Sequence, residues 1–359
     1  MKLNLTETMS IDELRKAIPI IGKSLTPVII SEPGVGKTSL LNMLEEDLGT
    51  TEYDFIYVDC PVKDMSDIGM VIPNHETRTL EYYVSSLFKL GNGKKKVICL
   101  DELMKAPKLL QIIFTRMMLE RMVGDEPLPK GSIIFATSNN ATDGVGDSML
   151  AHAGNRVCKI EMAKPSPKEW LLWASENGIH RSIRSCVAMH PNWLASYRSG
   201  DQEENTVIFN PKRAGNQFVS PRSLAKSSVI VEHKNTLGEN ATMVALAGTI
   251  GVSAAKQMSA FLSLEEQLPD FKDILKKPDD IEVPKDMSAL LMIMFQAIDL
   301  LETQDELSKF MKFVKRVASD ECQAIFFTMI MRAKRTAKIA RNNEEIKSWA
   351  VANHELFGD

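Results

Sequence analysis

Short uninterrupted apolar runs alternate with amphipathic stretches over the first 160 residues. Runs of about four apolar residues bounded by polar turns are typical of strands buried on both faces of a parallel sheet. In the stretches between them, apolar positions recur every three or four residues, as in helices that cover such a sheet. The pattern therefore predicts an α/β unit with strands at Val28–Ile30, Phe55–Val58, Val97–Leu100, Ser132–Thr137 and Val157–Ile160.

The polar signals between these runs predict the other elements of this unit. Ser10 and Glu13 have capping-box spacing, which predicts a helix from Ile11 to Ile21. Further helices are expected over Gly36–Leu48, from Tyr83 to Lys89, and over Lys108–Met122, and a small hairpin over Val123–Leu128. The lysines at 94–96 favour a solvated loop over a binding patch.

Pro165 and Pro167 mark a domain boundary, and the chain beyond them is mainly helical. Ser220 and Pro221 have the residue types that open a helix, because a proline at the first helical position loses no hydrogen bond. We expect an α/β domain over 1–164, a helical lid over 165–240 and a helical region over 241–359. Apolar stripes in the last region favour core packing over a partner groove; they lie at Met243–Phe261, Ala289–Leu301, Leu307–Val317 and Cys322–Ile339.

Composition narrows the class of protein. The 359 residues are 44% hydrophobic and 25% charged, which excludes wholesale disorder. A formal net charge of -4 gives no global attraction to nucleic acid or an anionic membrane. The five cysteines show no paired spacing and are interpreted as reduced residues, and the longest apolar run near the C-terminus, Ala289–Phe295, is too short to cross a bilayer. A cytoplasmic location follows as an expectation.

The segment Ser31–Thr38 indicates a phosphate-binding loop between the first apolar run and the helix after it. Glycines let successive backbone N–H groups turn toward an anion, and the helix N-terminus adds partial positive charge. Lys37 would reach the terminal phosphates and Thr38 would offer a hydroxyl to Mg²⁺, although Ser31 stands where the first glycine is usual. The expected nucleotide contacts are Pro33, Gly34, Val35, Gly36, Lys37, Thr38 and Ser39.

Two further polar sites follow apolar runs at the predicted carboxyl edge of the sheet. Asp101 and Glu102 come directly after Val97–Leu100, and carboxylates in that position are costly unless something positive lies beside them. Next to a phosphate loop, Asp101 would hold magnesium through water and Glu102 would polarise the attacking water. Asn139 follows the strand at 132–137, and its amide would contact phosphate and water; an ordinary loop asparagine is the alternative.

Five sites along the chain resemble five elements of AAA+ ATPases in the same order. The loop at Gly34–Thr38 resembles Walker A, and Asp101–Glu102 resembles Walker B. Asn139 resembles sensor 1, Arg156 the arginine finger and Arg222 sensor 2. Within that superfamily the chain looks most like the MoxR group and its phage-encoded relatives, which resemble the ATPase subunits of cobalt and magnesium chelatases. The resemblance extends over roughly residues 10–235. Three motifs carry the match to the MoxR group, at Leu100–Pro107, Phe135–Asn139 and Phe218–Ser223.

The resemblance implies a P-loop AAA+ parallel-sheet sandwich, a helical lid and a ring, usually of six subunits, with ATP and Mg²⁺ between neighbours. On that pattern Arg156 acts in trans, and Arg222 on the lid contacts the γ-phosphate of its own subunit's nucleotide. Residues Asp67–Tyr83 resemble a hairpin inserted in helix 2 of this clade, and with Val123–Leu128 they would face the pore. A von Willebrand A domain protein is the implied partner.

Two other classes of function stay open. A nucleic-acid motor or loader, such as a helicase or clamp loader, shares the same core, but the acidic pI near 6.0 counts against it. A scaffold that binds nucleotide without turnover could dispense with Glu102, which this sequence keeps.

Overall fold

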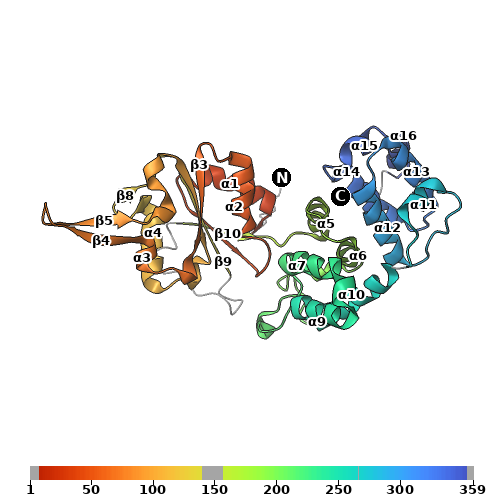
Figure 1. The fold of residues 1–359 in the computed structure, drawn as a ribbon, viewed down its shortest axis with the longest axis horizontal. Helices are drawn as coiled ribbons and strands as arrows, with labels where there is room; N and C mark the ends of the chain where they lie inside the picture. The colour runs from red at the N-terminus through yellow and green to blue at the C-terminus, as the bar shows by residue number, and fades with distance from the viewer. Residues whose placement is uncertain (1–7, 140–156, 266, 354–359) are drawn as a thin grey trace. The chain divides into compact units, whose positions relative to one another are not determined.

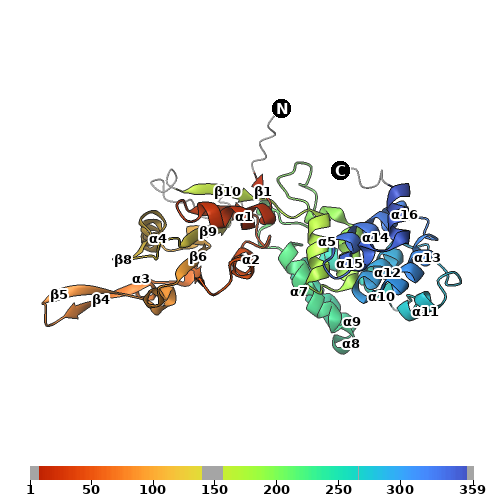
Figure 2. The ribbon, with the colours of Figure 1, turned by 90° about the horizontal axis from the view of Figure 1, so that it is seen from above.

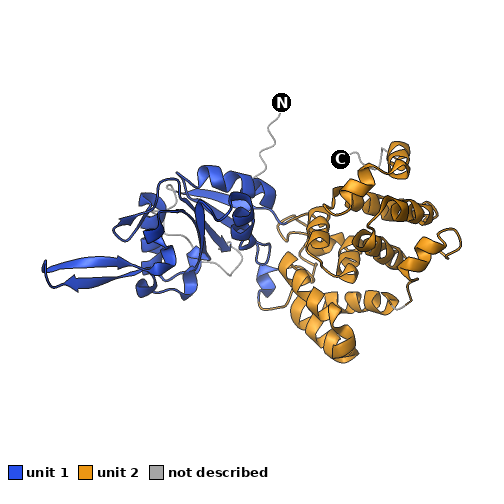
Figure 3. Cartoon of the chain, turned by 45° about the horizontal axis from the view of Figure 1, so that its top comes forward, with its two compact units in different colours: residues 1–164, 210–214 blue, residues 165–209, 215–359 orange. Residues whose placement is uncertain are grey.

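The computed structural model describes residues 8–139, 157–265 and 267–353. The chain divides into two compact units, which Figure 3 shows in different colours. Unit 1 comprises residues 1–164 and 210–214, and unit 2 comprises residues 165–209 and 215–359. The predicted division at residue 240 stays a prediction.

A six-stranded sheet in the order β1-β10-β2-β9-β6-β3 organises unit 1 (Figure 1). Every neighbouring pair in it is parallel. Parallel neighbours need long crossover connections, which here contain helices, so the predicted fold class of an α/β sandwich followed by a helical region is confirmed. The strands are β1 (Thr8–Met9), β2 (Pro27–Ser31), β3 (Tyr53–Asp59), β6 (Lys95–Asp101), β9 (Ile133–Asn139) and β10 (Cys158–Met162).

Alternate side chains of the central strands enter two separate cores, one on each face of the sheet. On β9, Ile133 and Phe135 pack with α1 (Ile11–Ile21) and α2 (Ser39–Leu48), whereas Ile134 and Ala136 pack with α4 (Lys108–Glu120). This two-residue period follows from strand geometry and explains why the strands are apolar throughout. Figure 1 shows the helices on either side of the sheet.

The predicted helix over 11–21 is confirmed. Ser10 caps α1, and the Ser10 side chain accepts from the Glu13 backbone N–H while the Glu13 carboxylate accepts from the Ser10 N–H. Leu14 and Ile18, one helical turn apart, are fully buried on the face that meets the sheet. The helix ends at Gly22, where a side chain would meet the Ile18 carbonyl and the Ile133 side chain.

The predicted helix from Tyr83 to Lys89 is wrong. A single 3₁₀ turn, η2 (Ser86–Phe88), occupies most of that segment. The hairpin that the resemblance implies over Asp67–Tyr83 is confirmed as an antiparallel ribbon of β4 (Gly69–Asn74) and β5 (Thr79–Val84). This ribbon extends away from the sheet (Figures 1 and 2). Since both its faces are largely exposed, its sequence lacks the alternation that reveals a strand covered on one side. The predicted second hairpin is confirmed as β7 (Met122–Val123) and β8 (Glu126–Pro127).

Tyr82 packs the two hairpins against each other. A Cβ placed on Gly124, in the β7–β8 turn, would lie 2.0 Å from Tyr82 Cε1, and one on Gly69 would lie 2.5 Å from the Tyr82 hydroxyl oxygen. The ring therefore occupies the space that side chains at both glycines would need. Gly124 also has a φ of 58°, which disfavours any other residue there. The contact of Tyr82 with the β7–β8 turn stabilises the β4–β5 ribbon, because an isolated two-stranded hairpin is only marginally stable in water.

Lys96 departs from the predicted solvated loop. It lies on β6 with no exposed surface, and its Nζ donates to Asp54 Oδ2 at 2.7 Å, Lys89 O at 2.7 Å and Asn92 Oδ1 at 2.6 Å. The Lys96 ammonium, with an amide from Asn92, lowers the pKa of the Asp54 carboxyl. A buried ammonium is tolerated because these acceptors replace its water.

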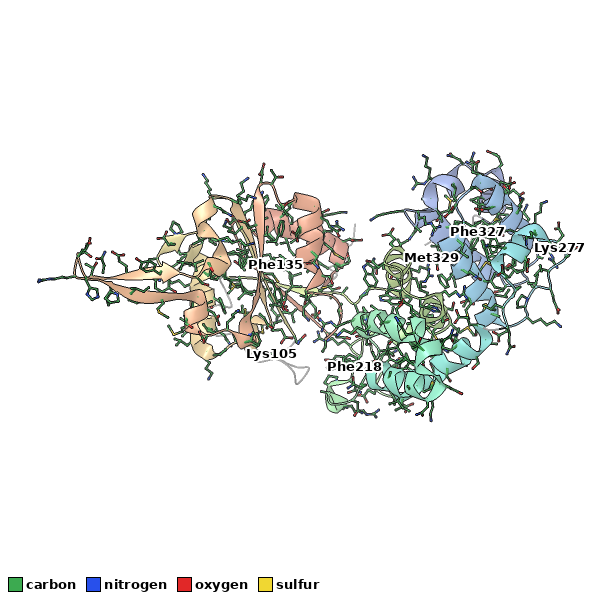
Figure 4. All side chains as sticks on the ribbon, viewed as in Figure 1. Lys105, Phe135, Phe218, Lys277, Phe327 and Met329 are labelled. Atoms are coloured by element: carbon green, nitrogen blue, oxygen red, sulfur yellow. The ribbon has the colours of Figure 1, made fainter. Side chains whose placement is uncertain are left out.

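Unit 2 is a helical assembly around α12 (Met287–Leu300). Residues 290–295 of this helix are all at most 4% exposed, as expected for a helix that is apolar on every side. Phe327 and Met329 on α14 (Asp320–Arg332) belong to the same core (Figure 4). The helices packed against α12 are α5 (Pro167–Glu176), α6 (Arg181–Met189), α10 (Val252–Glu265), α11 (Phe271–Lys276) and α14. The other α-helices that the structure describes in unit 2 are α7 (Pro221–Glu232), α8 (Lys234–Leu237), α9 (Glu239–Ile250), α13 (Gln304–Val314), α15 (Ala337–Arg341) and α16 (Glu344–Ala352).

The apolar stripe over Met243–Phe261 is interrupted. Gly251 separates α9 from α10 with a φ of 86°, and a Cβ there would lie 2.8 Å from the Gln217 carbonyl oxygen. Residues on both sides of the predicted boundary at 240 contribute to one hydrophobic cluster. Within the described ranges, no helix combines the length and apolarity that a membrane span requires.

The five cysteines are free thiols, as predicted. Burial raises the pKa of Cys322 to about 12, with a further contribution from the charge of Glu321. Burial likewise raises the pKa of Cys60, Cys99 and Cys186, so these thiols stay protonated at neutral pH.

Candidate functional site

Ser31, Asp101 and Asn139, three of the polar residues singled out from the sequence, lie at the carboxyl edge of the sheet. In the pairing of β2 with β9, Ser31 lies opposite Asn139, and in the pairing of β3 with β6, Asp59 lies opposite Asp101. The direction in which strands are added reverses at β2. Strands β3, β6 and β9 lie on one side of it, whereas β10, which follows them in the chain, lies on the other. Ligands of open parallel sheets bind outside the carboxyl ends of strands at such a reversal.

The loop between β2 and α2 has a backbone suited to an anion. Gly34 has a φ of 76° and Gly36 a φ of 110°, values that glycine adopts without strain. Helix α2 follows, beginning at Ser39, with Thr38 as its N-cap residue. The Thr38 side chain makes no capping hydrogen bond, which leaves its hydroxyl available to another group. Loop and helix N-terminus together form the type of nest that binds phosphate.

Lys37 is held over this loop. It is 7% exposed, and its Nζ donates to Ser31 Oγ at 2.9 Å, to Asn139 Oδ1 at 2.8 Å and to the carbonyls of Ser31 and Glu32 at 3.3 Å. The Ser31 hydroxyl in turn donates to the Glu32 carbonyl at 2.9 Å. The serine at the unusual position therefore gives Lys37 a side-chain acceptor that glycine could not provide.

Asp101 lies at the end of β6 and accepts hydrogen bonds on both carboxylate oxygens. Thr137 donates to Oδ1, and Tyr57 donates to Oδ2 at 2.7 Å. Thr38 Oγ1 lies 3.4 Å from the same Oδ2. Burial, followed by the hydrogen bond to Asp101, raises the pKa of Tyr57. The phenol therefore stays protonated and donates to the carboxylate.

Glu102 turns toward Asn139. Its backbone is left-handed, with φ 50° and ψ 38°, a conformation that costs a non-glycine residue about 1 kcal/mol or more. Its N–H donates to Thr137 Oγ1 at 3.3 Å. Asn139 Nδ2 lies 3.3 Å from Glu102 Oε1, and Lys105 Nζ, on the following 3₁₀ turn η4 (Leu103–Lys105; Lys105 is labelled in Figure 4), lies 2.6 Å from Oε2.

These residues fit a magnesium nucleotide. Mg²⁺ in nucleotide sites takes one or two protein oxygens and completes its shell with phosphate and water. The hydroxyl of Thr38 and the carboxylate of Asp101 form such a partial set, whereas no cluster of three or more His, Cys, Asp or Glu suited to a metal exists among the described residues. A hollow of about 240 Å³ adjoins them, lined by Thr38, Ser39, Leu41, Asn42 and Tyr57.

The structure thus brings together Lys37, Thr38, Asp101, Glu102 and Asn139 in unit 1. Arg222 is an exposed residue in the first turn of α7 in unit 2, where Pro221 occupies the first helical position and the Ser220 side chain caps the helix, as expected for a helix opened by these residues. Arg156 lies outside the described residues. The catalytic and binding roles of all these side chains stay predictions.

Three site residues were not anticipated from the sequence: Tyr57, Lys105 and Thr137. Thr137 had a detectable signal, because it is a polar residue within the buried strand β9 and lies two positions before Asn139. Lys105 is three residues after Glu102, a spacing that a 3₁₀ turn brings together. Tyr57 depends on the register of β3 against β6, which no local pattern specifies.

No protein-family model matches the chain, and no curated protein matches it in sequence. Among solved structures, the chain is similar to a variant of RuvB from Thermotoga maritima, with 14% identity, a TM-score of 0.35, and coverage of 76% of this chain and 74% of that one. It is also similar to NtrX from Brucella abortus in complex with ATP, with 12% identity, a TM-score of 0.37, and coverage of 98% of this chain and 69% of that one. Likenesses at these identities and TM-scores assign neither a family nor a function.

Proposed function

We propose that the chain is a ring-forming AAA+ ATPase of the MoxR type that couples ATP hydrolysis to remodelling, assembly or metal loading of a partner protein. One connected set of polar contacts supports this most strongly. Lys37 Nζ reaches Asn139 Oδ1 at 2.8 Å across 102 positions of sequence, and Asn139 Nδ2 reaches Glu102 Oε1 at 3.3 Å. A phosphate-binding lysine, a polar amide and a carboxylate thus meet at one edge of the sheet, as phosphoryl transfer to water requires.

Each residue has a distinct task in this proposal. The loop N–H groups and Lys37 bind the phosphates, and Thr38 and Asp101 hold Mg²⁺, which when bound supplies positive charge to the phosphate oxygens. Glu102 orients water and accepts its proton, and Asn139 positions that water against the phosphate. Lys105 donates to Glu102 Oε2 at 2.6 Å, which engages one lone pair of the carboxylate and leaves others to accept from water.

The β4–β5 ribbon supports a role in engaging another protein. Leu80 is 73% exposed, and Met70 and Tyr83 are each 55% exposed. Apolar side chains gathered on a projecting ribbon favour contact with protein over contact with nucleic acid. On the MoxR resemblance, this ribbon and the β7–β8 hairpin would face the pore of the ring, and a von Willebrand A domain protein would be the partner.

Hydrolysis by the purified chain tests the proposal. We expect release of phosphate from ATP in the presence of Mg²⁺, and a loss of at least about 100-fold when EDTA removes the metal, because the positive charge that offsets the phosphates and the Asp101 carboxylate is then absent. Phosphate release and sedimentation with and without ATP give turnover and assembly. A chain that neither binds ATP nor hydrolyses it contradicts the proposal, and salt-sensitive stimulation by DNA would favour the nucleic-acid motor instead.

Mixing two inactive variants tests the role of Arg156 in a ring. A neighbour's arginine completes a site only if that neighbour keeps Arg156 and the site itself keeps Lys37. In an equal, random mixture of Arg156→Ala and Lys37→Ala subunits, about one quarter of the interfaces meet both conditions, so about a quarter of the parent activity should return. Each variant measured alone is the control. A mixture as inactive as its components would contradict action in trans.

A further inference from the structure

A buried ion pair adjoins the phosphate loop and has no part in the catalytic scheme above. Glu32 is the first residue after β2, and its side chain is 7% exposed. Lys164, whose side chain is 6% exposed, places Nζ 3.8 Å from Glu32 Oε2. The loop that is expected to bind a polyphosphate therefore begins with a carboxylate that is withdrawn from water.

The sheet brings these two residues together. Strands β2 and β10 are parallel neighbours in which Ile30 lies opposite Glu161, so the segments that leave both strands run along the same edge. Ala163 N–H donates to the Met9 carbonyl at 2.8 Å, which keeps the chain beyond β10 beside the sheet. Lys164 follows directly and is the last residue before Pro165, where unit 2 begins. The pairing of two central strands thus determines the position of both charges.

The charge of Glu32 opposes the task of its own loop. A carboxylate near bound phosphates repels them, and water does not screen a buried charge well. An adjacent ammonium cancels that field and also compensates the cost of burying the carboxylate. Burial lowers the pKa of Lys164, while the charge of Glu32 acts in the opposite direction.

We propose that Lys164 is a positioning residue of the nucleotide site, which holds the Glu32 carboxylate against the end of β10 and neutralises it so that the loop accepts phosphate. The inference rests on the proposed function, because it assumes that the loop binds a nucleoside triphosphate. It adds a basic residue outside the phosphate loop to the groups that determine nucleotide affinity. It also makes the phosphate loop sensitive to the segment that leads into unit 2.

Removing first the ammonium and then the carboxylate tests this. Lys164→Met takes away the positive charge beside Glu32 and should weaken MgATP binding at least about tenfold, whereas Lys164→Arg should stay near the parent. Adding Glu32→Gln to Lys164→Met removes the repulsion and should restore affinity to within about threefold of the parent. Lys159→Met is the matched control, since Lys159 is an exposed lysine on β10, five residues before Lys164.

Dissociation constants for MgATP and thermal unfolding midpoints separate the outcomes. An affinity of Lys164→Met within about twofold of the parent, or a double variant as weak as the single one, would overturn the inference. Because Glu32→Gln also removes an unpaired buried carboxylate, the loss of affinity must be measured well below the unfolding midpoint of Lys164→Met, and a loss that appears only together with unfolding overturns the inference as well. If Lys164→Met does not fold, Glu32→Gln alone decides, and unchanged or weaker ATP binding counts against the inference. A parent protein that binds no ATP contradicts the proposed function itself.

Discussion

Replacement of Lys37 by alanine is expected to abolish ATP binding, with a loss of affinity of about 10³-fold. Lys37 Nζ lies at the loop, where it donates to Ser31 Oγ at 2.9 Å and to Asn139 Oδ1 at 2.8 Å. When a protein charge is buried and hydrogen-bonded to a ligand charge, truncating the protein side chain costs about 2–5 kcal/mol of binding free energy. This cost raises the dissociation constant by a factor of about 30 to several thousand. Titration with a fluorescent nucleotide would measure the dissociation constants of the parent and of the variant.

Two further variants make the Lys37 result interpretable. Lys37→Met keeps most of the buried stem while removing the charge, and it should lose binding as severely as Lys37→Ala. Lys23→Ala removes an exposed lysine from unit 1 and should leave affinity unchanged. Retention of ATP binding within tenfold by a folded Lys37→Met protein would mean that the segment 31–38 is a glycine-rich turn without a phosphate-binding role.

The strands that form the site were predictable because they are buried on both sides. Val28–Ile30 and Val97–Leu100 are continuous apolar runs, and the structure places them in β2 and β6 with every side chain at most 2% exposed. A parallel arrangement then places the residues after both strands at one edge. Burial thus explains why the sequence alone assigns Asp101 and the phosphate loop to the same edge.

The partners of Asp101 could not be predicted in the same way. Tyr57 reaches Asp101 only because Asp59 lies opposite Asp101 in the β3–β6 pairing, and a shift of one residue would turn Tyr57 to the other face. Register depends on the packing of whole strands. A local pattern specifies which residues form a strand, but not which residue of the neighbouring strand lies beside each of them.

Wrong predictions arose where exposure and local pattern disagree. Lys96 belongs to a run of lysines, a pattern that favours solvent exposure. Its ammonium is nevertheless buried in unit 1, where it donates to Asp54, Asn92 and the Lys89 carbonyl. The run of charges does not reveal these acceptors. The β4–β5 ribbon gave no strand signal because both its faces are exposed, and only the resemblance to a helix-2 hairpin indicated it. Tertiary contacts therefore override the local pattern at Lys96, whereas the ribbon lacks the one-sided burial that produces a strand pattern.

The two adjacent carboxylates differ in ways that suit different roles. Asp101 is 7% exposed, accepts from Tyr57 and Thr137, and lies nearest to Thr38, so it is fixed in place beside the expected metal. The Glu102 side chain is 34% exposed and is held by Lys105 and Asn139, contacts that it can exchange for water. A rigid carboxylate suits metal binding, and a more accessible one suits proton transfer.

Glu102→Gln is accordingly expected to bind ATP within about threefold of the parent while hydrolysing it at least about 10²-fold more slowly, since general-base catalysis contributes about 10²–10⁴-fold. The amide keeps the size of the side chain and can still accept from Asn139 Nδ2, but it cannot take a proton from water. Single-turnover hydrolysis with bound ATP separates chemistry from binding. The variant should also hold ATP and any partner protein long enough for capture.

The matched control is Glu120→Gln on α4, where the same chemical change removes a carboxylate paired with Arg116, with Nε and Oε2 2.7 Å apart. It should leave both binding and hydrolysis at the parent level, because that pair is half exposed and lies toward the C-terminal end of α4, whereas Glu102 and Lys105 precede its N-terminal end. Hydrolysis by Glu102→Gln at the parent rate would show that the carboxylate is not the base. Equal losses in both variants would point to a general effect of charge on unit 1 in place of a specific proton transfer at Glu102.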